Sequence, residues 1–231
     1  SEERFRLLAR DSDVLVFEIN YLEHTLAELA CDIPGATRVF HHYKLDFCCG
    51  GKVKLGEAIV GRAFSGEQIC ADLAAVAQQP ADERDWRESG IGELIEHILT
   101  RYHAIHRIQL PELIRLAKRV EHVHGERQDC PKGLSSHLAL MLDELEQHMQ
   151  KEEQILFPLL QAGQYAVAAG PIQVMQLEHE EHGDNLQTME RLTDNITPPP
   201  FACVTWRALY TGLNQLREDL MAHIHLENNV L

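Results

Sequence analysis

Two segments of the chain, QHMQKEEQ and MAHIHLEN, each carry a histidine and a glutamate four residues apart. Residues i and i+4 of an α-helix lie on one face, so His148 stands next to Glu152 and His223 next to Glu227. Apolar residues recur around each pair at spacings of three and four, which places both pairs on faces directed at a core. A buried imidazole and carboxylate cost several kcal/mol unless they are paired or bind a metal. The sequence therefore predicts a metal centre between helices.

Each polar pair interrupts an otherwise apolar stripe. The stripe of the first segment comprises Leu138, Met141, Leu145, His148, Glu152, Ile155 and Leu159. That of the second comprises Trp206, Leu209, Leu213, Leu216, Leu220, His223 and Glu227. The alternative interpretation is an ion pair at i and i+4 on the surface of a helix, and the position of both pairs within apolar stripes argues against it.

Composition narrows the class of protein. With 231 residues, of which 45% are hydrophobic, the chain is long enough for one or two domains with a buried core. The net charge of −15 argues against binding to nucleic acid or to an anionic membrane surface. The sequence has no run of about eighteen apolar residues, so no membrane span is expected. The six cysteines form no disulfide framework, which favours a reducing cytoplasm.

Helix signals divide the chain into four parts. Residues 1–25 are expected to form an extension, residues 26–79 a small domain of short helices with Ser65 as an N-cap, and residues 80–90 a linker. Residues 91–231 carry long helices, expected over roughly 91–122, 135–161, 172–195 and 201–231, with a kink at Pro111. Because short connections make neighbouring helices antiparallel, the sequence predicts an all-α, up-down-up-down four-helix bundle.

The other two bundle helices also carry histidines on apolar stripes. At about 1.5 Å per residue, His103 and His148 both lie roughly 20 Å from one end of the bundle, and His179 and His223 can lie level with them. His124 follows His103 by 21 residues, or about 31 Å along the axis, and is excluded from the site. His106 and His182 are expected to orient ligands or line a pocket, with a ligand role left open. Glu153 and Glu180 are interpreted as surface charge.

The predicted ligand set is His103, His148, Glu152, His179, His223 and Glu227. Four imidazoles and two carboxylates are too many for one tetrahedral zinc ion. They suit two irons, or two manganese ions, each with two histidines, bridged by both glutamates and by an oxo or hydroxo group. This arrangement leaves a coordination position open for a small ligand such as O2 or NO. The Glu-x-x-His pattern of ferritin-type sites occurs only once, ending at His124, so that alternative fails.

These residues resemble a known family. His103, His179 and the two His-x-x-x-Glu pairs resemble the di-iron bundle of haemerythrin-like proteins, although haemerythrins carry a further histidine where this chain has Gly183. The segments YKLDFCCGG, RYHAIHRIQLPEL, HMQKEEQILFP and HIHLENNVL are similar to those of the iron–sulfur cluster repair di-iron proteins. The resemblance covers about residues 26–231.

The resemblance implies a cytoplasmic di-iron protein that repairs or protects iron–sulfur clusters damaged by nitric oxide or oxidative stress. It would act by iron donation, by NO binding and turnover, or by both, and NO turnover would make it an enzyme. Damaged iron–sulfur proteins and the small ligands NO or O2 are the expected partners, and a homodimer is left open. The rival interpretation is a haemerythrin-like protein that binds or senses O2 or NO, which the residue at 183 disfavours.

The resemblance also implies a redox or transfer role for Cys48 and Cys49. Glycines at positions 50 and 51 free the backbone and keep both thiols accessible. A vicinal disulfide, an iron handover point and NO transfer are all compatible with this sequence. An inert turn is the alternative.

Overall fold

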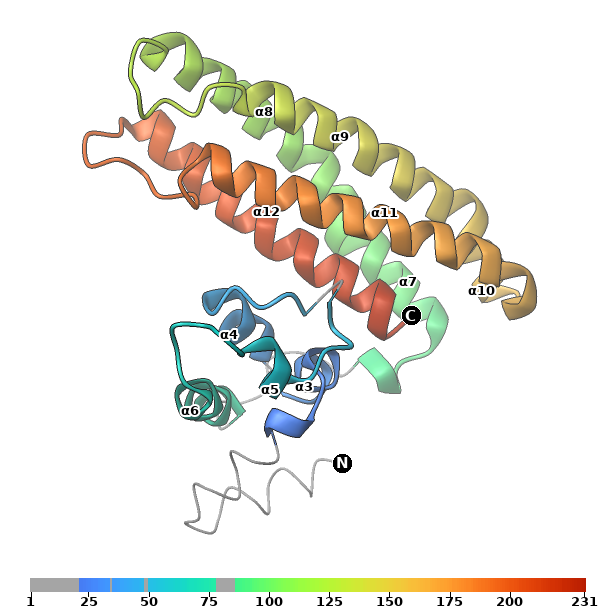
Figure 1. Ribbon diagram of the computed structural model, residues 1–231. Coiled ribbons are helices and arrows are strands. Elements are labelled where there is room, and N and C mark those ends of the chain that lie inside the picture. The colour runs from blue at the N-terminus through green and yellow to red at the C-terminus, as the bar shows by residue number, and fades with distance from the viewer. Residues whose placement is uncertain (1–20, 34, 48–49, 78–85) are drawn as a thin grey trace. The chain divides into compact units, whose positions relative to one another are not determined.

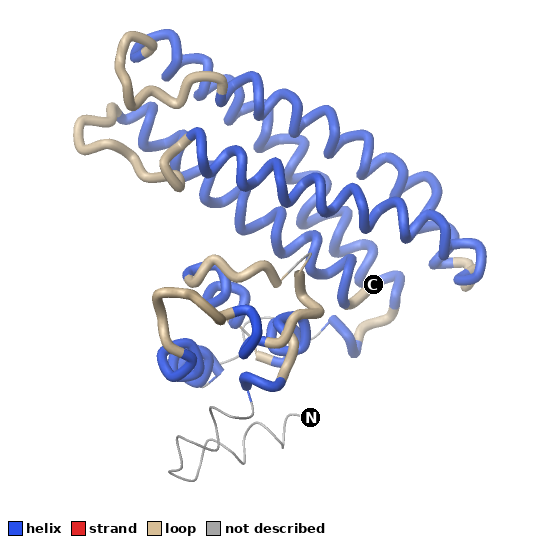
Figure 2. The backbone as a smooth tube through the Cα atoms, viewed as in Figure 1, coloured by secondary structure: helices blue, strands red, loops and turns tan. Residues whose placement is uncertain are grey.

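The computed structural model describes residues 21–33, 35–47, 50–77 and 86–231 of the chain. Helices dominate these residues, and the β pairing found among them is the isolated antiparallel bridge between Thr25 and Lys54 (Figure 2). The described residues fall into two compact units. One comprises those up to Ser89 together with Ile224–Val230 at the end of the last helix, and the other comprises Gly90–His223. The predicted all-α class is confirmed.

The first unit is built from short helices (Figure 1). They are α3 (Leu26–Asp32), α4 (Ala36–His42), α5 (Leu55–Ala58), α6 (Gly66–Ala77) and the 3-10 turn η1 (Trp86–Glu88). Thr25 and Glu28 form a capping box at the start of α3. The Ser65 hydroxyl accepts a hydrogen bond from the Gln68 N–H at 3.2 Å, as expected of an N-cap. The buried side chains of this unit include Leu26, Leu29, Phe40, Leu55, Ile69 and Leu73.

The second glycine of the Cys-Cys-Gly-Gly sequence lies where two backbone segments approach closely. The Gly51 carbonyl accepts a hydrogen bond from the Ala27 N–H at 2.9 Å. A Cβ atom on Gly51 would lie 2.5 Å from the Phe47 carbonyl oxygen and 2.9 Å from the Ala27 Cβ. Any side chain at this position would displace backbone, so packing alone accounts for the glycine. Cys48 and Cys49 lie outside the described residues, and their role stays a prediction.

The second unit is the bundle, with its four long helices running antiparallel (Figure 1). Helix one comprises α7 (Ile91–Ile98), the π-helical turn η2 (Leu99–His103) and α8 (Ala104–His124). Helix two comprises α9 (Leu134–Lys151), the π-helical turn η3 (Glu152–Leu156) and α10 (Phe157–Gln161). Helices three and four are α11 (Tyr165–Leu192) and α12 (Val204–Asn229).

The π-helical turn η3 shifts the buried stripe of helix two by one residue. The Phe157 N–H donates to the Glu152 carbonyl, five residues back instead of four. Up to Glu152 the buried residues follow the predicted stripe. Beyond it Leu156 and Leu160 are buried, whereas Ile155 is 51% exposed. The prediction that Ile155 faces the core is therefore wrong, because a π turn adds a residue that a spacing of three and four does not contain.

Helix three begins seven residues earlier than predicted, at Tyr165 instead of 172. Pro171, which directly precedes the predicted start, lies inside α11. A proline removes one helical hydrogen bond, and the packing of this helix already begins before it, since Ala168 is fully buried. Pro111 likewise lies inside α8.

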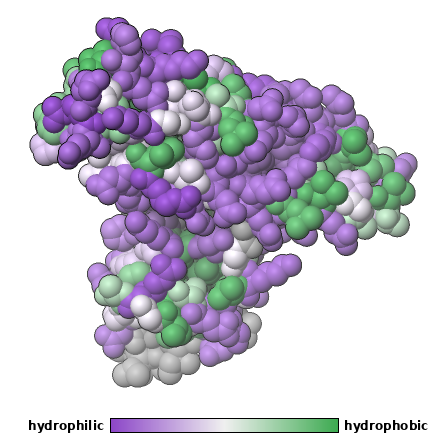
Figure 3. Space-filling model, turned by 45° about the horizontal axis from the view of Figure 1, so that its top comes forward, coloured by the Kyte–Doolittle hydropathy of each residue, from purple (hydrophilic) through white to green (hydrophobic). Residues whose placement is uncertain are grey.

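Hydrophilic side chains cover most of the bundle face shown in Figure 3, in keeping with the net charge of −15. The green patches on that face are separate from one another (Figure 3). In the part of the chain that the structure describes, no helix is long and apolar enough to cross a membrane.

Candidate metal centre

Four buried histidines, one from each bundle helix, converge in the interior. His103 ends η2, His148 lies on α9, His179 on α11 and His223 on α12. Each is at most 2% exposed. Imidazoles rarely occupy such positions unless their nitrogens are bonded, because burial of an unbonded polar group costs free energy.

The four rings form two pairs. The Nε2 atoms of His103 and His223 lie 3.2 Å apart, and those of His148 and His179 lie 3.0 Å apart. At such distances two imidazole nitrogens either share one proton in an N–H···N hydrogen bond or direct both lone pairs at a cation. A cation between the rings of each pair would accept both lone pairs.

Glu152 lies between the two pairs, with one oxygen toward each. Its Oε2 is 3.4 Å from His103 Nε2 and its Oε1 is 3.3 Å from His148 Nε2. The side chain is 1% exposed. Among the described residues, neither oxygen accepts a hydrogen bond. An unsatisfied buried carboxylate costs about 1–3 kcal/mol or more, and metal coordination would satisfy both oxygens at once.

Glu227 completes two groups of potential ligands. One ligand atom from each of His103, Glu152, His223 and Glu227 lies within 4.8 Å of the others, and the same holds for His148, Glu152, His179 and Glu227. The two groups share both glutamates. Glu227 follows His223 by one turn on the same continuous helix. The structure thus brings together all six residues that the sequence singled out, as two histidine pairs with shared carboxylates.

Comparison with known proteins identifies both halves of the chain. Residues 94–231 match the family described as "Hemerythrin HHE cation binding domain", and residues 22–77 match "Domain of Unknown function (DUF542)". The chain is 50% identical over 213 residues to "Iron-sulfur cluster repair protein YtfE" of Dickeya chrysanthemi, which covers 92% of this chain and 96% of the relative. It is 50% identical to the protein of that name in Escherichia coli O157:H7, with 91% and 96% covered. A "Probable iron-sulfur cluster repair protein" of Haemophilus influenzae is 48% identical, with 92% and 96% covered.

The chain belongs to the iron–sulfur cluster repair family. The resemblance found in the sequence is confirmed. The matched family is described as cation-binding, and both histidine–glutamate groups lie within the residues that it covers.

Two carboxylates contact the Nδ1 atoms of His103 and His148, the ring nitrogens that do not take part in the Nε2 pairs. His103 Nδ1 lies 2.8 Å from Glu153 Oε1, and His148 Nδ1 lies 3.0 Å from Glu178 Oε2. A carboxylate accepts the proton of Nδ1, which leaves the lone pair of Nε2 directed into the cluster. Both histidines are therefore held in the tautomer that a metal ligand requires.

Each outer carboxylate is itself held by a cation. Arg107 donates to Glu153 at 2.8 Å, and Lys151 donates to Glu178. Burial alone would raise the pKa of the Glu153 carboxyl, but hydrogen bonds from Arg107 and His103 outweigh it and lower that pKa. The pKa of Glu178 is lowered in the same way, with Lys151 and His148 outweighing burial. Both groups are therefore anionic acceptors at neutral pH.

The sequence analysis missed this outer layer. Glu153 was interpreted as surface charge, and that interpretation is wrong because its carboxylate contacts His103. Glu178 was not singled out at all. The only signal available was a cation near each ligand, since Arg107 follows His103 by four residues and Lys151 follows His148 by three.

The other bundle histidines do not join either group of four. His106 and His182 are buried, and their rings lie 5.4 Å and 4.9 Å from those of His223 and His148. They pack against the cluster, and their predicted role in orienting ligands stays a prediction. His124 lies at the other end of α8, where its Nε2 is 3.3 Å from Cys203 Sγ.

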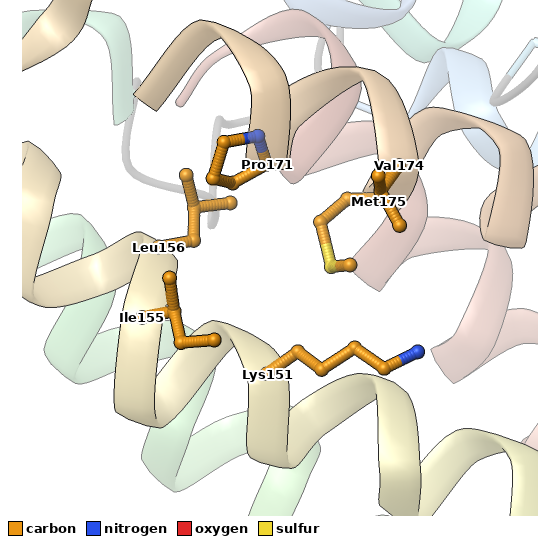
Figure 4. Close-up of a pocket in the computed structure, with 6 residues that line it drawn as sticks. All are labelled: Lys151, Ile155, Leu156, Pro171, Val174 and Met175. Atoms are coloured by element: carbon orange, nitrogen blue, oxygen red, sulfur yellow. The ribbon is translucent and has the colours of Figure 1, made fainter. Parts of the chain in front are cut away.

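An apolar pocket lies one helical turn from the His148–His179 pair. Its volume is about 300 Å³, and it is lined by Lys151, Ile155, Leu156, Pro171, Val174 and Met175 (Figure 4). Leu156 follows Glu152 by four residues and Met175 precedes His179 by four. The lining side chains point into a common space between η3 and α11 (Figure 4). The pocket and the cluster therefore share the same two helices.

Proposed function

We propose that this chain repairs iron–sulfur clusters and that two iron ions held by His103, His148, Glu152, His179, His223 and Glu227 are its working centre. The observation that carries the proposal is the pair of ligand groups that share both glutamates. The relatives named for iron–sulfur cluster repair, similar over nearly their whole length, support it.

The residues of the proposed metal centre have separate roles. His103 and His223 would hold one ion and His148 and His179 the other, and Glu152 and Glu227 belong to both groups of ligands. Glu153 and Glu178 fix the rings of their histidines. Bound iron supplies an open coordination position for NO or O2 and an ion that can be given up.

Damaged iron–sulfur proteins are the targets of this activity, in the cytoplasm, and the damage is due to nitric oxide or oxidants. The apolar pocket between η3 and α11 suits an uncharged molecule such as NO. Iron donation would need a handover point, which we assign to Cys48 and Cys49. NO turnover and iron donation use the same centre and are separated by experiment.

The first experiment is anaerobic reconstitution with ferrous iron, followed by metal counting and Mössbauer spectroscopy. We expect about two antiferromagnetically coupled irons per chain, as for bridged di-iron centres. The double variant Glu152→Leu/Glu227→Leu should lose them. Glu180→Leu makes the same chemical change at an exposed position beside His179 and should keep both. One iron or none in the wild-type protein would refute the proposed centre.

A second experiment tests repair itself. A hydratase that has lost iron from its four-iron cluster is incubated with iron-loaded protein, and its recovered activity is measured. Wild type should restore activity and Glu152→Leu should not. Cys48→Ser/Cys49→Ser should retain its iron but restore activity more slowly. Equal recovery with wild type and Glu152→Leu would reject donation from this centre while leaving the iron count untouched.

A further inference from the structure

A cysteine and a histidine meet at the end of the bundle away from the metal cluster. His124 is the last residue of α8, and Cys203 directly precedes α12. Their Sγ and Nε2 atoms lie 3.3 Å apart, although 79 residues separate them in sequence. Because His124 follows His103 by 21 residues along helix one, this pair lies about 30 Å from the cluster.

Cys203 differs from the other described cysteines in its exposure. Cys70 and Cys130 are buried, Cys31 is partly buried, and Cys203 is exposed. Burial, reinforced by the charge of Glu121, raises the pKa of the Cys130 thiol. A thiol reacts with dissolved reagents only when it is accessible and can lose its proton. Cys203 meets the first condition, and Cys130, at the same end of the bundle, is its natural control.

Two helix ends bring the Cys203 thiol and the His124 ring together. The Cys203 carbonyl accepts the hydrogen bond of the Arg207 N–H at 3.0 Å, so Cys203 occupies the N-cap position of α12. The fully buried Trp206 packs against the His124 ring, with 5.0 Å between ring centres.

Two arginines contact the residues that directly precede Cys203. Arg207 donates to the Ala202 carbonyl at 2.9 Å, and Arg127 lies 3.6 Å above the ring of Phe201. Arg127 also pairs with Asp129 at 3.1 Å. Both arginines contact residues that directly precede Cys203, and their positive charge suits a reagent that carries carboxylates.

We propose that Cys203 is a modification site for small anionic disulfides of the glutathione type, with His124 as the proton acceptor. The thiol proton passes to His124 Nε2, and Cys203 Sγ attacks one sulfur of the disulfide. The disulfide bond breaks, and its other half leaves as a thiolate that takes up a proton. Cys203 is oxidised to a mixed disulfide, one thiol is released, and no further oxidant is needed. Excess thiol reverses the reaction.

The test uses the full-length, iron-loaded protein and glutathione disulfide. Each cysteine-containing peptide is quantified by mass spectrometry over time. At pH 7 we expect Cys203 to react at least about tenfold faster than Cys130 and to slow by about tenfold or more in His124→Gln. His122→Gln changes an exposed histidine in the same turn and should leave the rate unchanged. At about pH 9.5, where hydroxide removes thiol protons, wild type and His124→Gln should converge.

Equal Cys203 rates in wild type and His124→Gln at pH 7 would overturn the role of His124. A Cys130 rate equal to or above that of Cys203 in the wild-type protein would overturn the site itself. This comparison needs no variant, so it decides the matter even where far-UV circular dichroism shows that His124→Gln does not fold.

Discussion

Replacing Glu152 with leucine should change the stability of the bundle in opposite directions with and without iron. In the metal-free protein the carboxylate is 1% exposed, and among the described residues it accepts no hydrogen bond. Leucine has a similar volume and carries no polar atom. The metal-free Glu152→Leu variant should therefore be more stable than the metal-free wild type, and iron should stabilise the wild type only.

The size of the effect follows from the burial of Glu152. A buried polar group without a hydrogen bond destabilises a protein by about 1–3 kcal/mol, and replacing it with an apolar residue of similar volume removes that cost. The substitution also removes the negative charge 3.4 Å and 3.3 Å from the ring nitrogens of His103 and His148, which offsets part of this gain. We expect a net gain of about 1–2 kcal/mol, or about 2–8 °C in Tm for a chain of this length. Iron at about a hundred times its Kd should add about 2.7 kcal/mol to the wild type.

The assay is guanidinium unfolding under anaerobic conditions, followed by far-UV circular dichroism, with a chelator or with ferrous iron. Glu180→Leu is the matched control, because the same change at an exposed position should move neither curve by more than about 0.5 kcal/mol. A metal-free Glu152→Leu variant less stable than the metal-free wild type would show that the carboxylate is satisfied without metal. That result would remove the physical argument for a metal at this place.

Three further predictions concern other parts of the molecule. Glu153→Gln and Glu178→Gln should each weaken iron binding by about 10–100-fold in competition with a chelator, and unchanged affinity would make these carboxylates bystanders. Burial and Asp72 raise the pKa of Tyr43 to about 12. The free energy of unfolding should therefore fall by at most about 2.7 kcal/mol as pH rises from about 10 to 12. In Tyr43→Phe this contribution should be absent. If the free energy of unfolding, measured by urea titration at each pH, falls as steeply in the variant as in the wild type, the prediction is wrong. Deleting Gln154 should remove the π turn and lower the iron count while helicity persists, and two irons in the deletion variant would contradict it.

The bundle was predictable because its signal is repeated many times. Apolar residues at spacings of three and four over four long segments predict both the helices and their buried faces. The six clustered residues were found for the same reason, since histidine and glutamate on an apolar stripe stand out chemically. The predicted start of α11 is too late because proline is disfavoured inside a helix, whereas Pro171 lies inside this one and the buried Ala168 precedes it.

The outer carboxylates were not predictable from local sequence. Glu153 lies 50 residues from His103, and Glu178 lies 30 residues from His148. Whether such pairs meet depends on which helices are neighbours and on how each is rotated. A glutamate next to a ligand residue looks the same in the sequence whether it is exposed or contacts a histidine. Glu180, next to His179, is exposed, whereas Glu178, on its other side, contacts His148.

The π turns explain why the rotation of these helices escapes a periodic pattern. His103 ends η2, and Glu152 begins η3. In each turn one N–H donates to a carbonyl five residues back, so one extra residue enters the helix without a change in composition. In helix two this extra residue lets Glu152 face the cluster while Leu156 and Leu160, instead of Ile155, continue the core. The irregular hydrogen bonding of both helices therefore lies beside residues proposed to hold metal.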